Sequence, residues 1–229
     1  MTNGDALLAR QRMTDGYKPV LYGKDFHRYA LHGNEFWILY DQNAAREHGY
    51  ALREERIFTT TPKLIMRQTG DSLIACFDDQ QFYSLKNTHV LLPLSDAYDL
   101  RCVLAQLNSM LLNWFYHKMI PEEGRALAEV KIDYVKELPI RRISFTTPPD
   151  RCATLVEEAK ARYSEFLGSS DSRKLLGFVG ACLDAKPEER DIVHDLLAFL
   201  AERMIEMNKE KNAEIKGFLG WLEGEVGAK

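Results

Sequence analysis

The sequence contains no apolar run long enough to cross a membrane. Its apolar stretches, such as residues 73–77 and 90–94, are far shorter than the roughly 18 residues that a spanning helix needs. The first twelve residues also lack the apolar segment of a signal peptide. With 229 residues, of which 45% are hydrophobic and 28% charged, the chain has the composition of one or two globular domains. We therefore expect a cytoplasmic protein with no membrane partner.

Cysteine and histidine are sparse, and neither residue type is spaced as a metal site requires. The four cysteines form no CxxC pair and lie in apolar sequence, which predicts reduced and buried thiols: Cys76, Cys102, Cys152 and Cys182. The six histidines include no HxxH, HxxxH or HExxH spacing. We expect no bound metal and no cofactor.

Familiar catalytic motifs are missing as well. The sequence has no GxGxxG, GxxxxGK[ST] or GxSxG loop, and no FxGxG or [DN]PP[YFW] motif of an amino-methyltransferase. The nearest match to a nuclease is Glu122 with Glu129 and Lys131. A nuclease holds its two carboxylates on adjacent strands around Mg²⁺, whereas here a turn and a helix are predicted. We expect no catalytic residue, and an enzyme that uses these three side chains remains an alternative.

The charge is distributed unevenly along the chain. Residues 1–148 carry 18 basic and 18 acidic residues, whereas residues 149–229 carry 12 and 16, so the net charge of −4 belongs to the C-terminal part. Any phosphate-binding surface in the first part must therefore be a local patch that folding creates.

The first 148 residues mix strand and helix patterns. Short apolar and aromatic runs, separated by Gly, Asn and Asp turns, predict strands over residues 26–31, 35–40, 63–67, 72–77 and 88–92. Short helices are expected at 43–48, 52–56 and 131–137, and an extended segment at 140–145. Apolar residues at steps of three and four from Leu100 to Phe115 predict one amphipathic helix that Pro121 ends.

A different pattern begins at residues 146–150, where Thr and Pro residues are typical of a helix start. Beyond them every segment reads as helix, and the last helix follows Pro187 with an apolar seam at Val193, Leu197, Leu200, Met204 and Met207. We expect this helix to pack on the two helices before it rather than to form an isolated coiled coil. The predicted fold class is therefore α+β: a mixed or antiparallel sheet domain over 1–147 and a helical domain over 148–229.

Five segments of the first domain resemble a known family. They occur in the expected order at residues 23–29, 62–78, 82–92, 104–112 and 130–140. The series resembles the TaqI-like C-terminal specificity domain of type IIG restriction-modification enzymes, a relative of the target-recognition domains of type I specificity subunits. The resemblance covers about residues 17–145, and the C-terminal helices are similar to the helical spacer and docking tails that accompany these domains.

The resemblance implies that the domain recognises a short sequence in double-stranded DNA. In that family a separate N-terminal region carries the methyltransferase and endonuclease chemistry, and the present sequence departs from the pattern by lacking it. We therefore expect a fragment of a longer enzyme or a free-standing recognition subunit, with the methyltransferase/endonuclease region of the same or a neighbouring polypeptide as its partner. An interaction protein that assembles through its C-terminal helices is the alternative.

Cations and amides near the glycine turns are the candidate DNA contacts, because Arg, Lys, Gln and Asn side chains can donate to phosphates and read base edges. We expect six residues to face DNA: Lys24, Arg28, Arg67, Gln68, Lys86 and Asn87. A buried ion pair between Arg67 and either Asp71 or Asp78 is the structural alternative for Arg67. The apolar motif positions are predicted core residues: Leu64, Ile65, Leu73, Ile74, Val90, Leu107 and Leu111.

Overall fold

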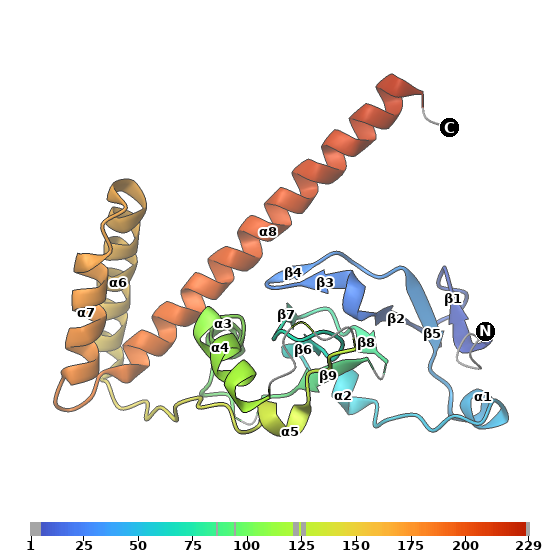
Figure 1. Cartoon of the computed structure of the whole chain (residues 1–229), viewed down its shortest axis with the longest axis horizontal. Helices are drawn as coiled ribbons and strands as arrows, with labels where there is room; N and C mark the ends of the chain where they lie inside the picture. Colours follow the sequence, from blue (N-terminus) through green and yellow to red (C-terminus); the bar gives the residue numbers. More distant parts are fainter. Residues whose placement is uncertain (1–5, 86, 94, 121–123, 125–126, 228–229) are drawn as a thin grey trace.

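The computed structural model describes residues 6–85, 87–93, 95–120, 124 and 127–227. The predicted α+β fold class is confirmed, because the strands lie in the N-terminal part and long helices make up the C-terminal part (Figure 1). Within the described residues no helix is both long and apolar enough to span a membrane. All four cysteines are free thiols, and three of them are buried.

The strands form a mixed sheet, an antiparallel sheet and a hairpin. The four-stranded mixed sheet has the order β1 (Leu8–Ala9), β5 (Phe36–Leu39), β2 (Tyr17–Leu21) and β8 (Tyr83–Ser84). The three-stranded antiparallel sheet has the order β7 (Ala75–Asp78), β6 (Lys63–Arg67) and β9 (Thr88–Leu91). The hairpin joins β3 (Phe26–His27) to β4 (Ala30–Leu31), directly after the 3₁₀ turn η2 (Gly23–Asp25).

Strand β6 is central to the body because both of its faces are buried. Alternate side chains of a strand point to opposite faces. Leu64 and Met66 accordingly pack into the cluster formed with the helices after the sheet, whereas Ile65 packs with Phe26 and Cys76 on the other side. The predicted strand at residues 63–67 is confirmed, and its apolar residues make it the scaffold on which the end residue Arg67 is held.

The predicted helix at residues 100–115 is wrong in one respect, because it is two helices: α3 (Leu100–Leu107) and α4 (Met110–Met119). Asn108 separates them. Its buried side chain donates to the Ala75 carbonyl at 3.0 Å and accepts from the Ala75 N–H at 2.9 Å. Ser109 then caps α4 by accepting from the Leu112 N–H at 3.1 Å. Since α4 starts in a new direction, Leu111 is 70% exposed instead of buried.

The shorter predicted helices differ in their limits, and the one predicted at 52–56 is wrong, because the helix there begins only at Arg56. The structure has helices at α1 (Gln42–Glu47), α2 (Arg56–Thr59) and α5 (Ile132–Val135). Residues 139–145 follow α5 without regular secondary structure, so the extended segment predicted there pairs with no strand. The strand predicted from residue 72 begins at Ala75. Ile74 still accepts from the Arg67 N–H, but Leu73 bonds side chains outside the sheet, with its N–H donating to the Asn113 Oδ1 and its carbonyl accepting from Arg28.

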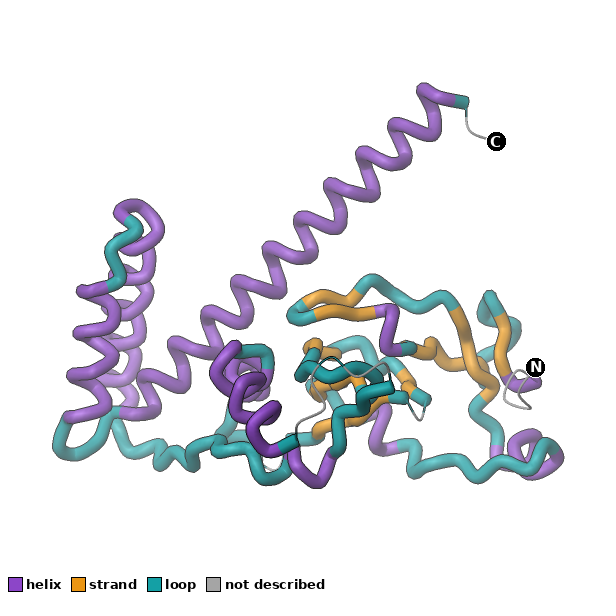
Figure 2. The backbone as a smooth tube through the Cα atoms, in the orientation of Figure 1, coloured by secondary structure: helices purple, strands orange, loops and turns teal. Residues whose placement is uncertain are grey.

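The C-terminal helices are α6 (Pro149–Ser169), α7 (Arg173–Asp184) and α8 (Arg190–Val226). The expected packing of the last helix on the two before it is confirmed for its first half, where α8 contacts both α6 and α7. The sequence did not predict that α8 also packs on α3. Figures 1 and 2 show the second half of α8 projecting as a straight rod beyond these contacts.

Polar contacts fix α8 to the body. Arg101 of α3 donates to both carboxylate oxygens of Asp99 and pairs with Glu202 of α8. The buried His194 ring accepts from the Asp99 N–H at 3.1 Å. Thr147 donates its hydroxyl to Asp191 at 2.6 Å, where the chain enters α6. The base of α8 is therefore held to α3 on one side and to the start of the helical arm on the other.

Candidate nucleic-acid interface

Three of the predicted DNA-facing residues meet at one end of the three-stranded sheet. Arg67 is the last residue of β6 and pairs in register with Thr88, the first residue of β9. One residue further, the Gln68 N–H donates to the Asn87 carbonyl at 3.1 Å. The antiparallel ladder therefore places Gln68 opposite Asn87 at this end of the sheet. The Arg67 side chain, one residue earlier, points to the other face, where it contacts Phe26. Lys86 lies outside the described residues.

Arg67 is half-buried and bonded to a neutral group. Its Nη2 donates to the Phe26 carbonyl at 2.5 Å and lies 3.4 Å from the His27 Nδ1, while the guanidinium lies 5.7 Å from the centre of the Phe26 ring. Its buried Nε has no hydrogen-bond partner, and burial lowers the pKa of Arg67 from its ordinary value. Arginine stays protonated in proteins, so the contacts orient the cation without neutralising it.

The structural alternative for Arg67 is wrong, because both carboxylates have other partners. Asp78 forms a fully buried ion pair with Lys63, at 2.6 Å, at the opposite end of β6. Asp71 accepts from the Ser72 hydroxyl at 2.8 Å and from the Gly124 N–H at 3.0 Å, and these bonds lower the pKa of Asp71. Arg67 therefore keeps a positive charge that no carboxylate of the described residues pairs with.

Arg28 reaches the same end of the sheet from the β3–β4 hairpin. Its Nε donates to the Leu73 carbonyl at 3.2 Å, and Leu73 lies next to Ile74, whose carbonyl accepts from the Arg67 N–H at 2.9 Å. Tyr29, the next residue, adopts the left-handed conformation with φ of 62° and donates its N–H to the Ala75 carbonyl. These bonds fix the hairpin tip against β7, and Arg28 forms no ion pair in the described structure.

Lys24 lies in the 3₁₀ turn η2, just before the hairpin, and its side chain reaches Glu35. Its ammonium pairs with Glu35 and lies 6.0 Å from the centre of the Phe36 ring. The hydrogen bond to Glu35 raises the pKa of Lys24. The turn itself lies close to Arg67, because a Cβ added to Gly23 would lie 3.2 Å from the Arg67 Cγ. The structure thus brings the Lys24 backbone near Arg67 while its charge is already paired.

Two histidines that were not predicted as contacts complete the cluster. The exposed His27 and His32 rings meet edge to face with centroids 5.3 Å apart. Burial, together with Arg67 and His32, lowers the pKa of His27. The single strand predicted over residues 26–31 is wrong, because the segment folds back as the β3–β4 hairpin and so brings the two rings together. We call His27, Arg28, His32, Arg67, Gln68 and Asn87 the sheet-end cluster.

Asn87 contributes an unsatisfied polar atom to the sheet-end cluster. Its Oδ1 is buried and has no hydrogen-bond partner. Buried polar atoms normally have partners, so an unpaired one needs an explanation. The Gln68 amide beside it is half-buried, with no side-chain hydrogen bond to another described residue. Amides of this kind can bond base edges, and bidentate Asn or Gln contacts are typical for adenine.

Of the three residues of the nuclease alternative, the structure describes Glu129 and Lys131. Glu122 lies outside the described residues. Thr69 and Glu129 form an isolated antiparallel bridge, and the Lys131 N–H donates to the Tyr116 hydroxyl at 2.9 Å. Among the residues that the structure describes, no group of three His, Cys, Asp or Glu side chains is placed to hold a metal ion.

The region that contains these residues matches a known protein family. A model of the TaqI-like C-terminal specificity domain matches residues 18–140, a span that runs from β2 through α5 and includes the whole sheet-end cluster. No curated protein matches the chain. Since the family model covers more than half of the 229 residues, the chain belongs to the TaqI-like C-terminal specificity domain family.

Proposed function

We propose that this chain is a sequence-specific double-stranded DNA recognition module of a restriction-modification system. It is non-catalytic by itself and directs a methyltransferase/endonuclease region, in the same or a neighbouring polypeptide, to its site in the cytoplasm. The observation that carries the proposal is the sheet-end cluster, where Arg28 and Arg67 carry charges that no described carboxylate pairs with, at the same end of the sheet as the Gln68 and Asn87 amides.

The cluster contains the two kinds of group that DNA recognition needs. Cations bind phosphates and release condensed counterions, which supplies affinity but no sequence information. Amides that reach base edges supply discrimination. Arg28 and Arg67 are held by the Leu73 and Phe26 carbonyls, so little side-chain freedom is lost when a phosphate or guanine binds.

The charge of the surroundings limits how strong the contact can be. Asp71 lies in the turn after β6, and Glu129 faces Thr69 across an isolated bridge. Asp71 is close to Gln68 along the chain, the bridge brings Glu129 next to Thr69, and the whole protein has a net charge of −4. We therefore expect weak binding to random DNA in isolation and a clear preference only for the correct site.

The experiment that tests the function is binding-site selection from random duplexes at low salt. A single enriched motif is expected, and enrichment of no motif contradicts the proposal. The motif should then be bound less tightly by the double variant R28A/R67A, measured by fluorescence anisotropy. The control is Arg173→Ala. Arg173 is an exposed arginine of α7 that pairs with Asp171, and both residues lie far along the chain from the sheet-end cluster.

A further inference from the structure

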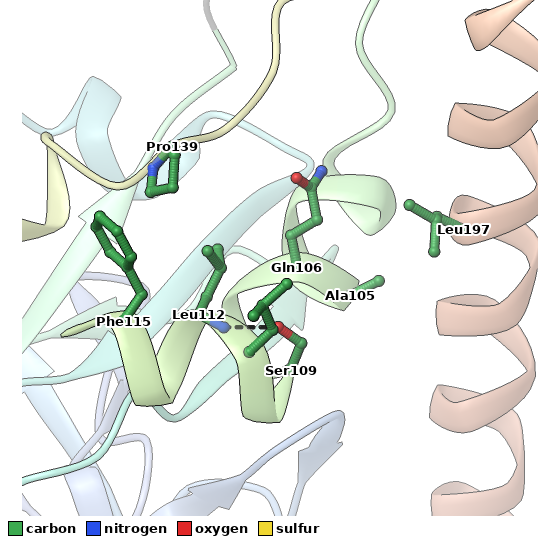
Figure 3. Close-up of a pocket in the computed structure, with 8 residues that line it drawn as sticks. Ala105, Gln106, Ser109, Leu112, Phe115, Pro139 and Leu197 are labelled. Carbon is green, nitrogen blue, oxygen red and sulfur yellow. Dashed lines mark hydrogen bonds between the residues drawn. The ribbon is translucent and has the colours of Figure 1, made fainter. Parts of the chain in front are cut away.

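Two apolar surfaces of the described chain have no partner, and they lie at different places. The first is a groove between α3 and α4, with a cavity of about 330 Å³ that Leu112, Phe115 and Pro139 line together with Leu197 of α8 (Figure 3). Beside it on α4, Met110 is 86%, Leu111 70% and Trp114 56% exposed. Exposed apolar residues that gather in one patch mark interaction sites, whereas scattered ones need no explanation.

The second surface is the projecting end of α8. Ile215, Phe218, Leu222 and Val226 are all exposed, and at 3.6 residues per turn they fall within about 80° of the helix circumference. Gly217, Gly220 and Gly224 lie in the same stretch and lower its intrinsic helix propensity. A helix end with a wide apolar stripe and three glycines depends on packing for its stability.

The two surfaces carry opposite charges at their borders. Near the groove, Lys118 lies over the Trp114 ring at 5.7 Å, and Arg141 and Arg142 follow Pro139; none of the three forms an ion pair in the described structure. Glu137 is the acid nearest to Arg141 and Arg142 along the chain, whereas Glu122 and Glu123, which lie outside the described residues, are nearest to Lys118. The α8 end carries Glu214, Glu223 and Glu225 against a single lysine, Lys216, over residues 213–226.

One chain cannot join its own two surfaces. Leu197 lines the groove, and Phe218 lies 21 residues further along the same straight helix, about 31 Å away at 1.5 Å per residue (Figure 1). A second copy has no such restriction. Pairing of two α8 ends with each other is the competing contact, and it would leave the α4 patch of both copies uncovered.

We propose that the groove between α3 and α4 is the docking site for the α8 end of a second copy, in a reciprocal dimer. The apolar stripe of each α8 end covers the α4 patch of the other copy, with Phe218 or Leu222 filling the cavity. The glutamates that border the stripe, Glu214, Glu223 and Glu225, then lie against Lys118, Arg141 and Arg142. This proposal goes beyond DNA recognition and does not depend on it.

The experiment measures the oligomeric state of the full chain by sedimentation equilibrium. A dimer is expected, and each of Trp114→Ser and Phe218→Ser should weaken it by about 30-fold or more, as for a central interface anchor. Both side chains are exposed, so the monomer should fold, which circular dichroism checks. Leu127→Ser is the matched control, because Leu127 is 94% exposed and belongs to neither surface.

Mixing the two variants distinguishes reciprocal docking from other contacts. The Trp114→Ser chain keeps an intact α8 end and the Phe218→Ser chain keeps an intact groove, so the mixture should form heterodimers with one complete contact. Pairing between α8 ends would instead leave Trp114→Ser dimeric, and mixing would restore nothing. A wild-type monomer at all concentrations, or loss of dimer by Phe218→Ser alone, overturns the proposal.

Discussion

Strand β6 has a basic residue at each end, and the two side chains have different kinds of partner. Lys63 begins the strand, is fully buried, donates to the Phe58 carbonyl at 2.6 Å and forms an ion pair with the buried Asp78. Arg67 ends the strand, is half-buried and bonds the Phe26 carbonyl. The first cation is paired with a carboxylate inside the protein, whereas the second bonds a neutral carbonyl. The kind of partner, rather than the residue type, therefore distinguishes the two cations, and the proposed function assigns only the second to DNA.

The largest effect is expected at the structural end. Lys63→Met leaves the Asp78 carboxylate buried without a cation, which should lower the free energy of unfolding by about 3–5 kcal/mol. Urea denaturation measures the loss. The double variant K63M/D78N should recover much of it, because the uncompensated charge is then gone. If Lys63→Met unfolds at the wild-type midpoint, the distinction between the two ends fails.

Asn87→Ala should weaken binding to the selected DNA site and leave the stability of the fold nearly unchanged. Its Oδ1 has no internal partner, so the free energy of unfolding should change by less than about 1 kcal/mol. Affinity for the selected DNA site should fall by about 1–3 kcal/mol, as for one lost base contact. Affinity for random duplex should stay the same. An equal loss for both DNAs would show that Asn87 does not read bases.

Acidification should strengthen DNA binding through His27. Its pKa lies below the ordinary value of 6.5, so the ring is neutral in the free protein at pH 7 and gains a charge beside Arg67 only as the pH falls. The same shift means that His27 favours the folded state above its unfolded pKa and destabilises it below that value. Anisotropy titrations from pH 7.5 to 5.5 should show rising affinity, and His27→Gln should flatten the rise.

Lys24→Met should have the smallest effect. Its charge is already paired with Glu35 on the surface, and exposed ion pairs contribute about 0–1 kcal/mol to stability. DNA affinity should change by less than about threefold, because removal of a paired charge alters the local field little. A loss as large as that of R28A/R67A would mean that Lys24 leaves Glu35 to bind phosphate.

The sequence predicted local elements well where periodicity was strong. Strand β6 has the predicted limits, because its four buried residues and the turn at Gly70 define it without help from the rest of the fold. The division between α3 and α4 was missed because Asn108 ends the first helix through a bond to Ala75, which is 33 residues away along the chain. Long-range bonds of this kind leave no periodic signal.

The candidate site was predictable only in part. The two strands whose pairing joins Gln68 to Asn87 were predicted, but the pairing and its register were not. The contact between the His27 and His32 rings, and the Phe26 carbonyl that holds Arg67, depend on where the hairpin packs. The exposure of Leu111 likewise depends on the direction that α4 takes after Asn108. Side-chain environment of this kind is set by tertiary packing.

The most direct test of the account is the salt dependence of DNA binding by wild type and Arg67→Gln. If Arg67 contacts a phosphate, the slope of log K against log salt should be less steep in the variant by about one, with little change in thermal stability. Lys24→Met serves as the control with a wild-type slope. An Arg67→Gln slope equal to that of wild type, at unchanged stability, would contradict the claim that the end of β6 holds a cation for DNA.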